Sequence, residues 1–328
     1  MFFRLAFTYI ILSAAQILFY TDRFLLNFPR VLIFTLFSLV LMFSFQNNSK
    51  YSSFYYDSSY LISEGNASLI DNSQNLPKLA QSTAFPEITA VSFLAVDLNS
   101  NSILVDYNKD LQLPPASTTK ILTALVAMDI YEGDEIIEIP SNCVQLNSTR
   151  AGFIALEKIS FNDLLVSLLV GSAGDSACAL SVSKVPYDDF ISLMNSKARN
   201  LGMRNSNFVN PIGLDAEDNL QYSTSYDLYL LTQELRKSSY LTNIVKTTQH
   251  KLTSGAFERY SYNTNELLWN YSGTVGIKTG RTAAAKEVLV YEYLEDSTNV
   301  LIIVMGSDNR FLDTRNILEW VLQNYNFY

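Results

Sequence analysis

The chain has 328 residues, a net charge of −9 and 48% hydrophobic residues, enough for one large folded domain with additional segments. The sequence contains no run of basic residues, which argues against nucleic-acid binding. Its two cysteines, Cys143 and Cys178, have no metal-ligand spacing. A bridge between them is chemically feasible outside a cell, but we expect them to stay unpaired.

Residues 1–46 are predicted to anchor the chain in a membrane. Residues 5–20 are uncharged and mostly apolar, and residues 31–45 form a second apolar run that is short for a full span. Arg23 and Arg30 lie between the two runs. A single signal anchor and a two-span hairpin with these arginines in the cytoplasm both place the remainder on the extracytoplasmic side. Because no cleavage site is evident, we expect retention in the membrane.

Residues 47–85 are rich in Ser, Asn and Tyr and show little periodicity, so we interpret them as a flexible stalk. A domain is predicted over 86–328. It opens with strands near 90–97 and 102–107, joined by a hairpin turn. The later elements are expected in this order: helices at 117–132, 160–170, 175–184, 187–201 and 225–237 (capped by Ser225), strands at 274–280, 287–295 and 298–306, and a helix at 311–324.

Two short motifs carry the chemistry. Ser117-Thr118-Thr119-Lys120 follows a proline-rich break and opens a helix, and Lys278-Thr279-Gly280 ends a predicted strand. Ser-x-x-K and K-T-G together are the signature of penicillin-binding proteins and related β-lactamases. Positions i and i+3 share one face of a helix, so the Lys120 amine can reach the Ser117 hydroxyl and act as its base. Lys120 serves only when neutral, and burial together with Lys278 as a second cation would lower its pKa.

Two other sets of residues are interpreted as inert. A second Ser-x-x-K string, from Ser181 to Lys184, falls inside a predicted helix, where we expect it to have no catalytic role. The single histidine, His250, lies in a polar stretch without a motif for a Ser-His-Asp triad.

From about Glu87 to the C-terminus, the chain resembles the low-molecular-mass D-alanyl-D-alanine carboxypeptidases, which are penicillin-binding serine peptidases. The segments that carry the resemblance occur in the family's order: Ser92–Asp97 with its hairpin, Pro115–Lys120, Ser172-Ala173-Gly174-Asp175, Asn210–Asp215, Tyr222-Ser223-Thr224 and Gly276–Thr282.

The resemblance implies an α/β (mixed) penicillin-binding/β-lactamase-like transpeptidase fold, in which helices flank an antiparallel sheet built from both ends of the domain. The implied activity is removal of the terminal D-alanine from peptidoglycan stem peptides through an acyl-enzyme on Ser117. β-Lactams would act as covalent inhibitors, and no metal or cofactor is implied.

The resemblance also implies roles for individual residues. Lys120 is the base, and Ser172 and Lys278 assist proton transfer. The strand Gly276–Thr282 would be an edge strand that lies beside the substrate peptide. Its substrate-binding residues would be Lys278, Thr279, Gly280, Arg281 and Thr282.

Within that strand, Lys278 and Thr279 would face the terminal carboxylate of the substrate. The backbone N–H groups of Ser117 and Arg281 would form the oxyanion hole, and the bare backbone of Gly280 would permit a close approach. Arg281 is also a candidate for binding the carboxylate through its charge. Arg310 is a weaker candidate, which we expect to be a surface charge.

The chain departs from the family at three places. The second motif of the family is Ser-x-Asn, whereas Gly174 lacks the amide that binds the lysine and the substrate carbonyl. Ile212 stands where many relatives have histidine, and Ala284–Glu287 stands where they usually have a glycine.

Three alternatives stay open. A D,D-endopeptidase that cleaves crosslinks shares every motif. Gly174 also fits a weakened or inactive protein that binds wall peptides or penicillin without turnover. A β-lactamase would need a deacylating carboxylate, and we find no motif for one.

Overall fold

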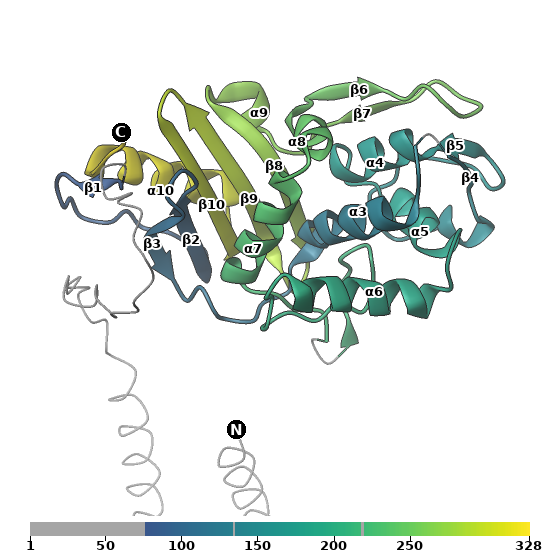
Figure 1. The fold of residues 1–328 in the computed structure, drawn as a ribbon, viewed down its shortest axis with the longest axis horizontal. Coiled ribbons are helices and arrows are strands. Elements are labelled where there is room, and N and C mark those ends of the chain that lie inside the picture. Colours follow the sequence, from purple (N-terminus) through teal and green to yellow (C-terminus); the bar gives the residue numbers. More distant parts are fainter. Residues whose placement is uncertain (1–75, 134, 218–219) are drawn as a thin grey trace, which may run out of the picture. The chain divides into compact units, whose positions relative to one another are not determined.

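The computed structural model describes residues 76–133, 135–217 and 220–328. A five-stranded sheet has the strand order β3-β2-β10-β9-β8, and every neighbouring pair is antiparallel (Figure 1). In chain order these strands are β2 (Ser92–Asp97), β3 (Ser102–Tyr107), β8 (Thr274–Thr282), β9 (Lys286–Glu295) and β10 (Thr298–Ser307). The two ends of the domain therefore share one antiparallel sheet, as the resemblance implies. The strand with the Lys-Thr-Gly motif lies at its edge.

Alternate side chains of a strand point to opposite sides of the sheet. The central strands are buried along most of their length because both sides of the sheet are covered. One face of the sheet contributes to the core of the helical layer through Val288, Val290, Leu301, Ile303 and Met305. The other face packs on helix α10 (Arg310–Asn324) through Leu289, Tyr291, Val300, Ile302 and Val304. The sheet is thus a middle layer between α10 and the remaining helices (Figure 1).

Helix α3 (Thr119–Ile130) is the centre of the helical layer, since every residue from Thr119 to Ala127 is buried. The surrounding helices are α4 (Phe161–Leu169), α5 (Gly174–Val182), α6 (Tyr187–Asn200), α7 (Ser225–Arg236) and α8 (Ser239–Lys246). All but α8 were predicted within two residues. The cap of α7 was assigned wrongly, because the side chain of Thr224, not that of Ser225, accepts the hydrogen bond from the N–H of Asp227.

The shorter elements were not predicted, because two to four residues carry too little periodicity. They are β1 (Lys78–Leu79), η3 (Ala116–Thr118), β4 (Ile136–Glu138), η4 (Ser141–Cys143), β5 (Lys158–Ser160), β6 (Gln249–Lys251), β7 (Tyr260–Tyr262), α9 (Leu267–Asn270) and β11 (Tyr325–Asn326).

The end of the predicted stalk belongs to the domain. Strand β1 pairs with β11, which directly follows α10. Thr83 donates to the Asn324 side chain, and the Phe85 ring stacks on Phe93 at a centroid distance of 5.3 Å. The predicted boundary at residue 86 is therefore too late by several residues, because polar residues around these anchors hide them in the sequence.

The predicted membrane anchor at 1–46 and the stalk up to residue 75 lie outside the described residues. Within the part of the chain that is described, no helix has both the length and the apolar character needed to cross a bilayer.

Cys143 and Cys178 form a disulfide, so the expectation that they stay unpaired is wrong. Cys143 ends η4 and Cys178 lies in α5, and their Cα atoms are 5.5 Å apart. The two cysteines are 35 residues apart in sequence, and only the packing of η4 against α5 brings them together. That tertiary contact has no local sequence signal.

We predict that replacing both cysteines with serine lowers the free energy of unfolding by about 4 kcal/mol, because the disulfide closes a long loop in the unfolded chain. Thermal unfolding with and without dithiothreitol measures the effect. Reductant is expected to destabilise the native protein and to leave the Cys143→Ser/Cys178→Ser variant unchanged. An equal melting temperature for the native protein in both conditions would contradict the prediction.

Candidate active site

The predicted nucleophile and its predicted base lie where η3 continues into α3. Ser117 lies in η3, and Lys120 lies in the first turn of α3 with its side chain buried. The Lys120 Nζ is 2.9 Å from the Ser117 Oγ, and it also donates to the carbonyl oxygen of Ile212 at 2.6 Å. The amine is therefore held against the hydroxyl from which it would take a proton.

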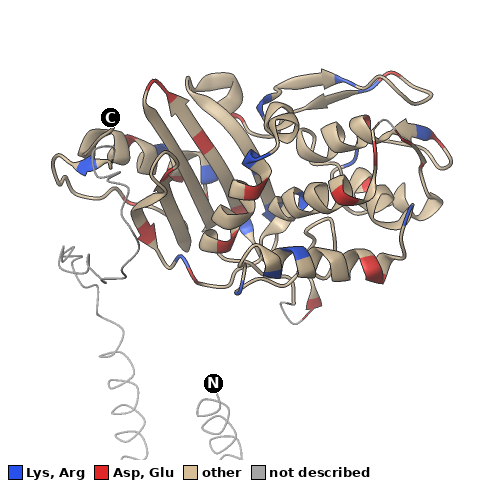
Figure 2. Ribbon diagram, viewed as in Figure 1, with Lys and Arg blue, Asp and Glu red and all other residues tan. Residues whose placement is uncertain are grey.

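Burial determines the charge state of this amine. Removal from water lowers the pKa of Lys120 to about 7, although the negative charge of Asp175 acts in the opposite direction. Charged residues are scattered over the ribbon (Figure 2), but Lys120 and Lys278 are each only 1% exposed. A substantial fraction of Lys120 is consequently neutral near pH 7.

The pKa of Lys278 is lowered well below its usual value, first by burial and then by the positive charges of Lys120 and Arg310. Of the two predicted causes of a low Lys120 pKa, burial is confirmed as the largest cause, and the charge interaction between the two lysines lowers the pKa of Lys278 instead. The Lys278 Nζ donates to the carbonyl oxygen of Thr279 at 3.1 Å.

Strand β8 touches the nucleophile segment through Gly280. A Cβ atom on Gly280 would lie 2.9 Å from the Ser117 backbone nitrogen and 2.9 Å from the Ala116 Cβ. Only glycine permits this approach. Arg281 follows directly, so the two N–H groups implied as an oxyanion hole belong to segments in contact with each other.

A loop at 210–215 supports the same segment from another side. Asn210 Oδ1 accepts from the backbone N–H groups of Ile212, Gly213 and Leu214. Gly213 has φ of +84°, and a Cβ there would lie 1.9 Å from the Ala116 carbonyl oxygen. The role of this loop was missed, and its only sequence signal is the Asn-Pro-Ile-Gly-Leu-Asp string.

The second motif forms the turn between α4 and α5. Ser172 is 6% exposed and has φ of +58°, a conformation that is strained for a residue other than glycine. Asp175, which follows in α5, is fully buried, and its carboxylate accepts from the N–H groups of Ala151 and Gly152 at 3.0 Å each. The structure thus ties this turn to the 151–153 loop.

The other predicted residues of β8 have different surroundings. The Thr279 hydroxyl is 2.5 Å from that of Thr264, and Thr282 donates to Asp215 at 2.5 Å. Arg281 is exposed. Arg310 is not a surface charge as expected, since its guanidinium is partly buried and donates to the Gly280 carbonyl oxygen at 2.9 Å.

The turn after β8 keeps its geometry without glycine. Lys286 has φ of +54°, the left-handed region that glycine favours, and its Nζ forms an ion pair with Asp308 at 2.9 Å.

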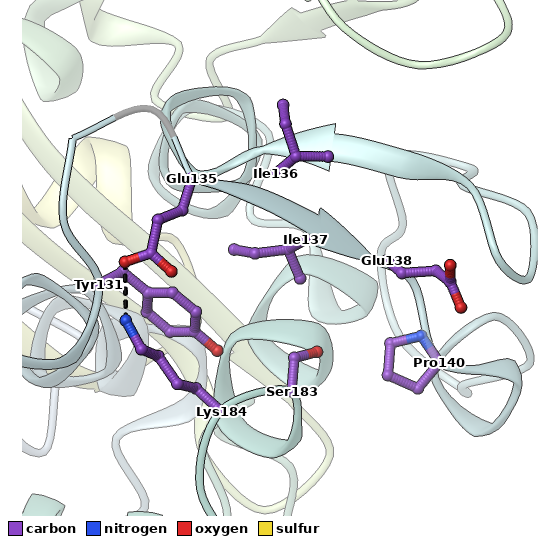
Figure 3. Close-up of a pocket in the computed structure, with 8 residues that line it drawn as sticks. All are labelled: Tyr131, Glu135, Ile136, Ile137, Glu138, Pro140, Ser183 and Lys184. Carbon is purple, nitrogen blue, oxygen red and sulfur yellow. Dashed lines mark hydrogen bonds and ion pairs between the residues drawn. The ribbon is translucent and has the colours of Figure 1, made fainter.

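The second Ser-x-x-K string lies at the C-terminal end of α5. The Lys184 Nζ pairs with Glu135 at 2.7 Å and lies over the Tyr131 ring, on the wall of a cavity of about 410 Å³ (Figure 3). The Ser181 hydroxyl donates to the Cys178 carbonyl oxygen. His250 lies in β6, opposite Ser261 of β7. These contacts agree with the interpretation that the string and the histidine are not catalytic.

Comparison with known proteins gives the site its context. The family model described as D-alanyl-D-alanine carboxypeptidase matches residues 79–309. The chain is 26% identical to the D-alanyl-D-alanine carboxypeptidase DacF of Bacillus subtilis over 72% of its own length and 63% of that protein's. It is 30% identical to the D-alanyl-D-alanine endopeptidase of Escherichia coli, covering 74% of this chain and 80% of that one.

Solved structures agree with this match. The D-alanyl-D-alanine carboxypeptidase of Mycobacterium tuberculosis is 26% identical, with a TM-score of 0.69 over 75% of this chain and 96% of that chain. The Streptomyces K15 DD-transpeptidase is 28% identical, with a TM-score of 0.68 over 74% and 100% of the two chains. The antiparallel sheet with its flanking helices is therefore the fold of penicillin-binding peptidases.

We predict that Gly213→Ala reduces acylation by penicillin at least about 100-fold, because the new methyl group displaces the backbone beside Ser117. Gly202→Ala is the matched control. Gly202 has the same φ of +84°, but its nearest contact to an added Cβ is at 3.8 Å. Both variants carry the same backbone strain, so equal acylation rates in the two would contradict the prediction.

Proposed function

The chain belongs to the D-alanyl-D-alanine carboxypeptidase family of serine peptidases, and on this premise we propose that it removes the terminal D-alanine from peptidoglycan stem peptides. The matched region spans 63% of the length of the B. subtilis relative. The observation that carries the proposal is the buried Lys120 amine, with a pKa of about 7, at 2.9 Å from the Ser117 hydroxyl.

Acylation begins at this pair. The neutral Lys120 amine takes the Ser117 proton as Oγ attacks the carbonyl carbon of the D-Ala-D-Ala bond. The carbonyl oxygen becomes an oxyanion, which accepts hydrogen bonds from the N–H groups of Ser117 and Arg281. When the C–N bond breaks, the leaving D-alanine amine receives a proton through Ser172 and Lys278. Burial favours such a relay, because it lowers the pKa of Lys278 well below its usual value.

Deacylation reverses the same steps with water in place of the amine. A water molecule loses a proton to the Lys120 amine and attacks the ester carbonyl, and Ser117 leaves with its proton restored. The products are a shortened peptide and free D-alanine.

Recognition of the substrate's terminal carboxylate involves Thr279 and Arg310. The Thr279 hydroxyl would donate to this carboxylate. Arg310 is placed next to it in the strand, because its guanidinium donates to the carbonyl oxygen of Gly280. The Arg310 Nε is buried without a hydrogen-bond partner among the described residues. An incoming carboxylate would offset the cost of burying this donor. Arg281, which is exposed, contributes mainly its backbone N–H.

A D,D-endopeptidase is the second candidate, and one observation favours it. The chain is 30% identical to the E. coli endopeptidase and 26% identical to the carboxypeptidase DacF. Both reactions use the same acylation chemistry, and they differ in what occupies the leaving-group side. A crosslinked dimer of stem peptides and a free pentapeptide, offered in competition, separate the two activities.

The proposed location is the cell membrane, and it is supported by the sequence and by the disulfide. Residues 1–46 would hold the chain in the cell membrane, with the peptidase domain on the extracytoplasmic side. The Cys143–Cys178 disulfide supports this placement, because such bonds persist in oxidising compartments. The substrate, peptidoglycan, is found on the same side of the membrane.

We expect the purified protein to release D-alanine from a pentapeptide stem and to form a covalent adduct with penicillin. Ser117→Ala should abolish both, whereas Ser181→Ala, in the second Ser-x-x-K string, should retain both. Intact-mass analysis and a D-alanine assay provide the measurements. D-Alanine release by Ser117→Ala would contradict the proposed function, and adduct formation without release would indicate the binding protein that Gly174 suggests.

We predict that the rate of acylation by penicillin increases with pH through about 7, because only the neutral form of Lys120 accepts the Ser117 proton. The rate at pH 6 should be about tenfold below the plateau at pH 8 to 9. Stopped-flow measurements from pH 5 to 9 test this, with Lys184→Met as the control that keeps the profile. A rate that still increases steeply between pH 8 and 9, as a lysine with its usual pKa of 10.5 would produce, would contradict the account.

A further inference from the structure

The space next to Gly174 is already occupied. A Cβ atom on Gly174 would lie 2.1 Å from the Ser148 Oγ and 3.0 Å from the Ser148 Cβ. It would lie 3.3 Å from the Ile212 Cγ2. The hydroxyl of Ser148 therefore stands where a side chain at position 174 would begin. The glycine of the second motif leaves no gap in the site, because a serine from a different loop fills it.

Backbone hydrogen bonds fix Ser148 in this position. The Gly174 N–H donates to the carbonyl oxygen of Thr149 at 2.7 Å. Just beyond, the buried Asp175 carboxylate accepts from Ala151 and Gly152. The loop that carries Ser148 is thus attached to the first turn of α5. A hydroxyl with such support costs little entropy to hold in place.

The same position adjoins the reacting groups. Ile212, whose side chain borders the space at Gly174, also accepts the hydrogen bond of Lys120 Nζ through its carbonyl oxygen. Ser172 lies two residues before Gly174. The Ser148 hydroxyl is partly exposed, and its hydrogen bond to the Thr149 carbonyl oxygen is long, at 3.2 Å. It can therefore donate to a bound molecule instead.

We propose that Ser148 is a substrate-positioning residue that supplies, from a different loop, the hydrogen-bonding group that Gly174 lacks. Its Oγ–H would donate to a carbonyl oxygen of the stem peptide, or of a β-lactam side chain, while Ser117 attacks. A hydroxyl offers one donor where an amide offers two, so it replaces part of the function of the missing side chain. This inference rests on the proposed peptidase function.

The geometry predicts a coupling between positions 148 and 174, which the full-length protein can test. Ser148→Ala should lower kcat/KM for acylation by penicillin about tenfold, and Ser148→Thr, which keeps the hydroxyl, should stay within about threefold of the native rate. Gly174→Asn should be impaired because its Cβ collides with Ser148. The double variant Ser148→Gly/Gly174→Asn should recover, since the smaller residue vacates the space.

Two controls separate positioning from folding. Ser141→Ala, an exposed serine in η4 of the same region, should leave the rate unchanged. Melting temperatures of all variants should differ by only a few degrees, and the Ser148→Ala loss should persist in variants that melt like the native protein. Native acylation by Ser148→Ala, or additive effects of the two substitutions in the double variant, would overturn the proposal.

Two measurements, the rate of acylation by penicillin and the release of D-alanine, distinguish this inference from the proposed function. If penicillin acylates the native protein and Ser148→Ala equally fast, the inference fails while the peptidase assignment stands. If Ser148→Ala slows acylation but the native protein releases no D-alanine from stem peptides, the carboxypeptidase assignment fails and Ser148 keeps its positioning role. A native protein that penicillin does not acylate would overturn both.

Discussion

The burial of two lysine amines beside one serine is the constraint on which the rest of this site depends. A lysine in water is protonated at neutral pH and cannot act as a base, and removal from water is what lowers its pKa. Burial lowers the pKa of Lys120 to about 7 and lowers that of Lys278 well below its usual value. At pH values where a lysine is protonated in the unfolded chain but loses its proton on folding, burial of its amine lowers the free energy of unfolding. The rest of the fold must compensate for this loss of stability. The two central cores, one on each face of the sheet, provide that stability.

The fold keeps this junction dry by bringing three backbone segments together around η3. Strand β8 approaches from the sheet edge at Gly280, the 210–215 loop approaches at Gly213, and helix α3 continues directly from the nucleophile. Two glycines meet the same few backbone atoms of Ala116 and Ser117. Side chains at either position would separate the layers and admit water to the lysines. The architecture therefore explains why an edge strand, an interior helix and a loop must all be placed to within a fraction of an ångström.

The sequence predicted whatever is local and missed whatever depends on contacts between distant segments. The Ser117–Lys120 pair follows from the spacing along one helix, and the edge strand with its Lys-Thr-Gly motif follows from the resemblance to the family. The Lys120 bond to Ile212 joins residues 92 apart, and the disulfide joins cysteines 35 apart. No pattern in the chain predicts either contact. The large downward shift of the Lys278 pKa was missed for the same reason, since burial is a property of the packed molecule. From the sequence, Gly174 indicates that a hydrogen-bonding side chain is missing from the second motif. The structure shows the Ser148 hydroxyl next to this glycine.

The central claim is that Lys120 is a neutral base because it is buried, and direct titration of its side chain tests this most closely. The ¹³Cε chemical shift of lysine, followed by NMR from pH 5 to 11, reports the protonation of each amine, and a Lys120→Met spectrum assigns the signal. The account predicts a transition near pH 7 that disappears in the variant. A Lys120 signal that titrates only near pH 10.5, the usual value for lysine, would show that the amine stays charged and would contradict the account.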